Sequence, residues 1–227
     1  MISTKGSPSW AFKGYNPIKR GANSYFPLTS HIAETGHFLS IVNRPGNTHD
    51  SSRALTVIRT IRRHLSDFVI RFRADSAFCS PDVINYLLKN RIGFAIKAPF
   101  WKLLTLKTAA ENRQRWCKIS AQWGYFWMKN PIDSIAHNHY VIILRKKRRD
   151  AKKPYQLKLF SPNNDRYEYS AVVTDTKQWN PQELLQFVSG RSAQENSISE
   201  LKNSFAFDHI PTNQYQANSA YMQMSQM

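Results

Sequence analysis

The stretch Asp67-Phe-Val-Ile-Arg-Phe-Arg-Ala-Asp75-Ser76 decides the fold class expected for this chain. Its β-branched and aromatic residues predict a short buried strand over residues 67–73, and an acidic residue, Asp75, follows that strand. Open α/β sheets bind their ligands in the crevice beyond the carboxyl ends of the strands, where this carboxylate is expected to lie. A lone Asp in such a position is more often a helix cap or a structural carboxylate, so the surrounding sequence must decide.

The sequence around this strand alternates between strand and helix patterns. The order is β-β-α-β-α-β over residues 25–97, which predicts an α/β sheet domain after a basic loop over residues 1–24. The predicted elements are strands over residues 25–33 and 37–42, a basic amphipathic helix to about Ser66 capped by Asp50 or Ser51, the strand over residues 67–73, a helix opened by Ser80-Pro-Asp82, and a strand over residues 93–97.

A change of pattern at about residue 101 divides the chain. Tryptophans and tyrosines interleave with basic residues over residues 101–175, which we interpret as a β-rich insertion. Within it, residues 139–145 and 169–174 predict strands, and the basic run that follows the first of them predicts a solvated loop. A last long helix is predicted from Asn180 to Lys202. The expected parts of the chain are therefore residues 1–100, 101–175 and 176–227.

The charge balance points to a polyanionic partner. The 227 residues include 32 Lys and Arg against 15 Asp and Glu, which gives a net charge of +17. So large an excess is most simply explained by nucleic acid, although a ribosomal or merely basic protein would also show it. Cys79 and Cys117 form no CxxC pair, and the sequence contains neither a secretory signal nor a long apolar run. We therefore expect a reduced, cytoplasmic, nucleoid-associated location and no membrane partner.

The segment Arg191-Ser-Ala-Gln-Glu195-Asn-Ser-Ile-Ser-Glu-Leu-Lys202 places a carboxylate between two cations. Residues four and seven apart share one face of a helix, so Arg191 and Lys202 would flank Glu195. An ordinary salt-bridged helix has the same pattern. In combination with Asp75, however, Glu195 supplies the hard oxygen ligands that select Mg²⁺ or Mn²⁺, and two such ions support phosphodiester chemistry.

Four segments, in order, resemble bacterial insertion-sequence transposases. They are Gly14-Tyr-Asn-Pro17, Asn43-Arg-Pro-Gly-Asn47, Arg73-Ala-Asp-Ser-Ala-Phe78 and Glu195-Asn-Ser-Ile-Ser-Glu-Leu-Lys202. The group is the DDE type with a ribonuclease-H-like fold and a YREK helix. The resemblance implies that residues 1–100 and 176–227 are two parts of one catalytic domain, interrupted by the β-rich insertion.

The resemblance also implies roles for single residues. Asp75 matches the second catalytic carboxylate and Glu195 the third, and both would bind the metal. Arg191 and Lys202 match the basic residues that contact DNA near the transposon end. The implied partners are double-stranded DNA, as transposon ends and target, and a second copy of the chain in a synaptic complex. Further phosphate contacts are expected from the basic run Arg145, Lys146, Lys147, Arg148 and Arg149.

Two departures from the family pattern lower the expected activity. Val188 stands where the family has the tyrosine of its YREK helix. The first catalytic carboxylate, which the family carries just before the Gly-Tyr-Asn-Pro segment, has no counterpart, because no Asp precedes Asp50 and the only earlier acid is Glu34. We therefore expect an open reading frame truncated at both ends and inactive as an enzyme by itself.

Two other functions remain open from the residues alone. A non-enzymatic basic DNA-binding protein would need no metal carboxylates, and a different metallonuclease could share the same fold. The ordered residues Arg191, Glu195 and Lys202 favour a transposase over a nuclease.

The basic composition generates the first testable expectation. Binding of a DNA duplex should weaken steeply with salt, because each neutralised phosphate releases counterions. If about six to eight phosphates are contacted, the logarithm of the binding constant should fall against the logarithm of the salt concentration with a slope of about −5 to −7. A titration series by fluorescence anisotropy measures this slope, and a value near zero would contradict an electrostatic mode.

Overall fold

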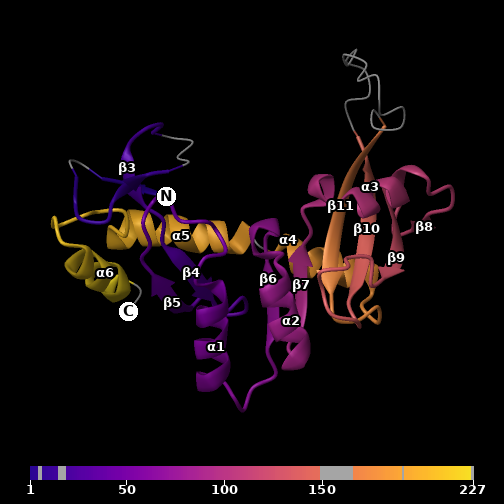
Figure 1. The fold of residues 1–227 in the computed structure, drawn as a ribbon, viewed down its shortest axis with the longest axis horizontal. Helices are drawn as coiled ribbons and strands as arrows, with labels where there is room; N and C mark the ends of the chain where they lie inside the picture. Colours follow the sequence, from indigo (N-terminus) through magenta and orange to yellow (C-terminus); the bar gives the residue numbers. More distant parts are fainter. Residues whose placement is uncertain (5–6, 15–18, 149–165, 191, 226–227) are drawn as a thin grey trace. The chain divides into compact units, whose positions relative to one another are not determined.

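The computed structural model describes residues 1–4, 7–14, 19–148, 166–190 and 192–225, with the backbone alone for residues 192–195. The chain forms two compact units (Figure 1). The first consists of Met1–Ser66 and Gly190–Met227, and the second of Asp67–Ser189. Both strands and helices occur in each unit, and the described residues include six α-helices. The predicted α/β class is therefore confirmed.

The second unit is built on a six-stranded mixed sheet. Its strand order is β6-β7-β11-β10-β9-β8, and only β6 and β7 are parallel within it. Three α-helices and two short 3₁₀-helices complete the unit. The strands are β6 Arg71–Ala74, β7 Gly93–Lys97, β8 Cys117–Lys118, β9 Trp123–Lys129, β10 Tyr140–Lys147 and β11 Tyr167–Thr174. The helices are η1 Ser76–Phe78, α2 Pro81–Lys89, η2 Phe100–Lys102, α3 Leu104–Glu111 and α4 Pro181–Ser189.

The β-rich segment continues the sheet that precedes it. Val172 and Val173 of β11 pair with Lys97 and Ile96 of β7, so the predicted insertion and the strands before it share one hydrogen-bonded ladder. The predicted strands over residues 93–97, 139–145 and 169–174 are confirmed. One face of this sheet packs against α4 through a buried cluster. Its members are Ala95, Ile142, Leu144, Val172, Leu184 and Val188.

The first unit contains two small antiparallel sheets and three helices. The hairpin of β4 and β5 confirms the predicted turn at residues 34–36, whereas residues 1–24, predicted as a loop, include three short strands. These elements are β1 Ile2–Ser3, β2 Phe12–Lys13, β3 Asn23–Tyr25, β4 Leu28–His31, β5 Phe38–Val42, α1 Ala54–His64, α5 Ser192–Phe205 and α6 Tyr215–Met224.

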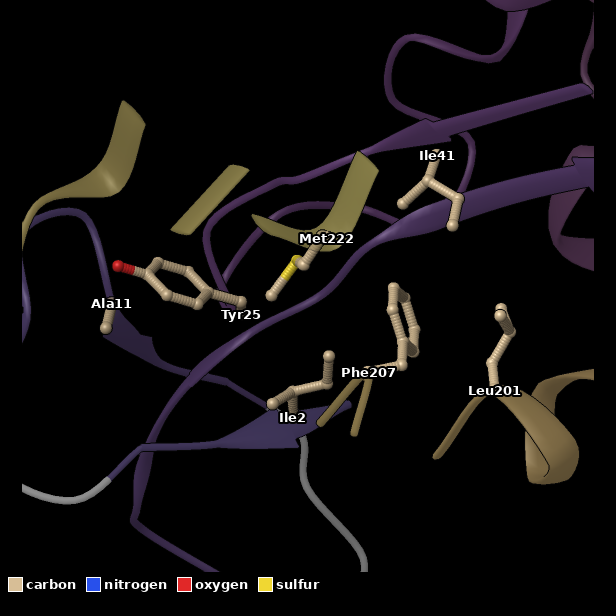
Figure 2. Close-up of a cluster of buried hydrophobic side chains, with 7 residues drawn as sticks. All are labelled: Ile2, Ala11, Tyr25, Ile41, Leu201, Phe207 and Met222. Atoms are coloured by element: carbon tan, nitrogen blue, oxygen red, sulfur yellow. The ribbon is translucent and has the colours of Figure 1, made fainter. Parts of the chain in front are cut away.

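A hydrophobic cluster joins the two ends of the chain in the first unit. Figure 2 shows its side chains converging from the N-terminal strands and from the C-terminal helical region. The buried members are Ile2, Ala11, Tyr25, Ile41, Leu201, Phe207 and Met222. The strands in residues 1–24 form because apolar side chains such as Ile2 can be buried here, a contact over about 200 residues that local turn composition does not reveal.

Two helix predictions are wrong in detail. The helix predicted from Asn180 to Lys202 is interrupted, because α4 ends at Ser189 and α5 begins at Ser192. Gly190 lies in the interruption, and glycine costs about 1 kcal/mol relative to alanine inside a helix. The helix predicted to start at an Asp50 or Ser51 cap starts instead after Arg53, which has φ 63° and gives no side-chain cap.

The strand predicted over residues 67–73 is also shorter than expected. It begins at Arg71, and Phe68 and Val69 before it are 67% and 95% exposed. β6 is the terminal strand of its sheet, so its partner on one side is β7 and the pairing starts only at Arg71 opposite Gly93. Residues 68–70 have the composition of a strand, but β7 begins at Gly93, opposite Arg71, and so does not extend alongside them. Composition alone does not show where a neighbouring strand begins.

Close glycine packing brings two of the motif segments together. A Cβ on Gly14 would overlap the carbonyl oxygen of Gly46, and a Cβ on Gly46 would lie 2.6 Å from the carbonyl oxygen of Ser24. Both obstacles are backbone atoms, which cannot rotate away as a side chain would. The Gly-Tyr-Asn-Pro segment and the Asn-Arg-Pro-Gly-Asn segment therefore meet in the first unit, where Gly14 contacts Gly46.

This contact predicts that Gly46→Ala destabilises the first unit, by about 1–3 kcal/mol if the cost is that of ordinary overpacking. Urea denaturation followed by circular dichroism measures the loss. Gly93→Ala is the matched control, because its Cβ would lie 3.6 Å from the Arg71 side chain, an ordinary contact. Equal effects of the two substitutions would contradict the packing argument.

Candidate active site on the β6 strand

Asp75 lies directly after β6, at the carboxyl end of the parallel pair. The ladder between β6 and β7 stops at Ala74 and Ile96, one residue before Asp75 and Lys97. Asp75 has extended backbone angles, and its Oδ1 accepts a hydrogen bond of 2.8 Å from the backbone N–H of Ser76. The carboxylate therefore caps the 3₁₀-helix η1, which fixes it at this end of the sheet.

Two arginines precede this carboxylate on the same side of β6. Side chains alternate along a strand, so Arg71, Arg73 and Asp75 share one face. That face meets α4, because Arg73 donates a 2.8 Å hydrogen bond to the carbonyl oxygen of Phe187. Sequence reasoning missed these arginines as part of the site. The signal was present in the i, i+2, i+4 spacing that ends at Asp75.

Glu195 and its two flanking cations belong to the other compact unit. The backbone of Glu195 lies in the first turn of α5, while its side chain and the whole of Arg191 lie outside the described residues. Lys202 lies in the last turn of α5 and is half-buried. Burial, and next the charge of Lys202, lower the pKa of the Met1 α-amino group, which places Lys202 near β1.

The basic run after residue 144 is only partly free to meet a ligand. The Arg145 guanidinium lies over two rings, 4.5 Å from the centroid of Trp116 and 4.6 Å from that of Tyr167. Lys146 lies over Trp123 at 5.4 Å, and Lys147 is exposed. Arg145 is thus also a packing residue, and it has room because its cross-strand neighbour is Gly124.

The remainder of this run is divided between an ion pair and undescribed residues. Arg148 lies 3.9 Å from the Glu168 carboxylate across the hairpin, and Arg149 lies outside the described residues. The tryptophans of β9 serve packing, since Trp123 and Trp127 are partly buried against the hydrophobic cluster between α4 and the sheet.

Comparison with known proteins then gives the family. The model of the transposase DDE domain, group 1, matches residues 12–227. This chain belongs to that family. No curated protein is similar enough to count as a match. The family assignment supports a transposase function and agrees with the resemblance carried by the four motif segments.

DDE transposase domains generally use divalent metal ions, which need several oxygen or nitrogen donors close together. Among the residues whose side chains are described, no three His, Cys, Asp or Glu side chains gather closely enough to hold an ion. Asp75 supplies carboxylate oxygen, the ligand type that Mg²⁺ and Mn²⁺ prefer, and Glu195 lies outside that set. The chemistry of the donor fits this transposase family, while the pairing of Asp75 with Glu195 remains a prediction.

Other titratable groups of this transposase serve the fold. Asp175 follows β11 and accepts a hydrogen bond from the backbone N–H of Phe94, at the opposite end of β7 from Asp75. Burial raises the pKa of the Cys79 thiol to about 11, so it is protonated at neutral pH. No helix among the described residues is long and apolar enough to cross a membrane.

His139 is a fully buried imidazole that holds the loop between β9 and β10. Its Nε2 accepts a hydrogen bond from the backbone N–H of Ile132, and its Nδ1 lies 2.9 Å from the carbonyl oxygen of Ala136. The neutral ring with its proton on Nδ1 satisfies both contacts. Burial lowers the pKa of His139, a shift that the bond to Ala136 opposes and His137 reinforces.

This lowered pKa predicts acid sensitivity of the second unit. The folded state favours the neutral ring, so its contribution is present above the unfolded pKa of about 6.5 and is lost as the pH falls through the folded pKa. The free energy of unfolding, measured in urea at pH 7.5 and pH 5, should therefore fall more for the wild type than for His139→Gln, whose amide can make both contacts. His64→Gln, on the exposed face of α1, should retain the wild-type pH dependence.

Proposed function

We propose that this chain is an insertion-sequence DDE transposase that binds DNA and holds a divalent metal ion through Asp75 and Glu195. We further propose that it is inactive as an enzyme by itself, because the first catalytic carboxylate of the family has no counterpart before Asp50. The observation that carries the proposal is the position of Asp75, a carboxylate fixed at the carboxyl end of a parallel strand, in a chain of the transposase DDE family. Mg²⁺ or Mn²⁺ bound there would activate the attacking oxygen and stabilise the leaving oxygen in phosphodiester chemistry.

The proposed catalytic domain is ribonuclease-H-like, built from residues 1–100 and 176–227 around a β-rich insertion over residues 101–175. The crossover from β6 through α2 to the parallel β7 supports this assignment, since parallel strands joined by a helix are typical of α/β domains. The two compact units follow a different division, with boundaries at Ser66 and Ser189.

The proposed YREK segment begins at the end of α4 and continues in α5. Val188, at the tyrosine position, is buried in the cluster between α4 and the sheet, at 7% exposure. This position therefore contributes to the core. We assign Glu195 to the metal, and Arg191 and Lys202 to phosphates of the transposon end.

The proposed DNA partner is supported by the net charge of +17 and by exposed cations such as Lys147. Two duplexes, the transposon end and the target, must be held together for strand transfer, so a homodimer in a synaptic complex is part of the proposal. Arg145 would contribute mainly through its field, because its guanidinium is stacked between two rings.

Isothermal titration with Mn²⁺ tests the metal assignment. Asp75→Asn keeps an oxygen that can cap η1, and Glu195→Gln keeps the size of the side chain, so each removes charge with little change of shape. Each should lower Mn²⁺ affinity at least about tenfold, since even residues that only support metal ligands have effects of 10–100-fold.

Two exposed carboxylates provide matched controls. Glu200 lies on α5 and Asp82 lies in the first turn of α2. Both Glu200→Gln and Asp82→Asn should leave Mn²⁺ affinity unchanged. If Mn²⁺ binds equally well to all five proteins, or to none, the metal assignment is wrong. A basic DNA-binding protein without catalysis would then be the better description, provided that DNA binding is retained.

A further inference from the structure

The contact between Arg73 and Phe187 joins the strand before Asp75 to the end of α4. Arg73 Nη1 donates a 2.8 Å hydrogen bond to the backbone carbonyl oxygen of Phe187, and its guanidinium also lies over the Phe187 ring, 5.5 Å from the centroid. One side chain of β6 therefore binds both the backbone and the side chain of the same helical residue.

This hydrogen bond gives a donor to a carbonyl group that has no partner within the helix. The last four carbonyl groups of a helix have no partner within it, and Phe187 is among them because α4 ends at Ser189. Cations stabilise the negative end of the helix dipole, yet the last turn of α4 contains no basic residue. Arg73 supplies from the strand a donor for this carbonyl group and a positive charge near the end of α4.

A second contact holds the start of the helix to the same strand. The Arg71 guanidinium lies over the Trp179 ring at 5.2 Å, and Trp179 precedes α4. The rings of Trp179 and Phe187 are themselves stacked, with centroids 5.4 Å apart and planes at 28°. Two arginines at alternate positions of β6 thus lie over two aromatic rings, one before α4 and one near its end. Of these two arginines, Arg73 is the one whose hydrogen bond to the helix end the structure shows.

We propose that Arg73 is a positioning residue of the transposase site. It ties β6, two residues before Asp75, to the end of α4, and so holds the strand end that carries the Asp75 carboxylate. This inference rests on the proposed pairing of Asp75 and Glu195 on one metal ion. In this role Arg73 acts through the end of α4 and contacts neither the metal ion nor DNA.

Two measurements on the full chain test the inference. Amide hydrogen exchange of peptides that cover residues 186–190 reports the helix end, and Mn²⁺ titration reports the site. In Arg73→Gln, exchange at the helix end should become faster, and Mn²⁺ affinity should fall about tenfold, the lower end of the range for residues that support metal ligands. Arg73→Lys, which keeps a charged donor without the planar fork, should recover part of both.

Arg71→Gln is the matched control, since it removes a stacked guanidinium two residues away without removing the bond to Phe187. It should leave both the exchange of residues 186–190 and Mn²⁺ affinity close to wild type. Unchanged exchange in Arg73→Gln would overturn the inference, and so would faster exchange with unchanged Mn²⁺ affinity, because Arg73 would then be a structural cap only. Equal effects of Arg71→Gln and Arg73→Gln would also overturn it.

A failure of the proposed metal site can be distinguished from a failure of the proposed role of Arg73. If the wild type shows no Mn²⁺ binding that depends on Asp75 and Glu195, the proposed function fails, and the role of Arg73 at the metal fails with it. Hydrogen exchange would still decide whether Arg73 holds the helix end.

Discussion

The parallel pairing of β6 with β7 is the constraint on which the second unit depends. Parallel neighbours cannot be joined by a tight turn, so the chain must cross over, and α2 provides that crossover between Ala74 and Gly93. Because both strands run the same way, both carboxyl ends lie at one edge of the sheet, where Asp75 caps η1. The remaining strands then add in antiparallel order beside β7 through β11. Placement of the carboxylate is therefore a consequence of strand direction.

Local patterns in the sequence predicted the elements that are determined locally. The strand over residues 93–97 and the helix opened by Ser80 agree with the structure, because Ser80 Oγ accepts from Val83 N–H and Val83, Ile84 and Leu87 are buried at helical spacing. The wrong predictions have causes outside the elements concerned. Arg44 is buried, and its guanidinium donates to the carbonyl oxygens of Phe26, Asp50 and Ser52, so a side chain outside α1 organises the start of this helix.

The candidate site shows the same limit. Asp75 could be found from the sequence, since its position after a strand pattern is a local signal. The role of Arg73 could not, because its partner Phe187 lies more than 100 residues away and is a backbone carbonyl, which carries no residue-type signal. The break between α4 and α5 was hidden for a related reason. Apolar spacing continues through Val188, and the end of α4 is stabilised by a donor from another element.

The net charge of +17 overstates the number of cations that are free to contact a polyanion. Arg44 binds backbone carbonyls, Arg62 binds the carbonyl oxygen of Ser66 beyond α1, and Arg71, Arg73 and Arg145 lie over aromatic rings. All are arginines, and a guanidinium suits such sites because it is planar, stacks on rings and offers several donors in a fixed fork. The charge itself is not lost when the group is used in this way. These residues add to the long-range positive field that would attract DNA in the proposed function, while the proposed phosphate contacts would fall to exposed cations such as Lys147. A basic sequence can therefore serve folding and ligand attraction with the same residues.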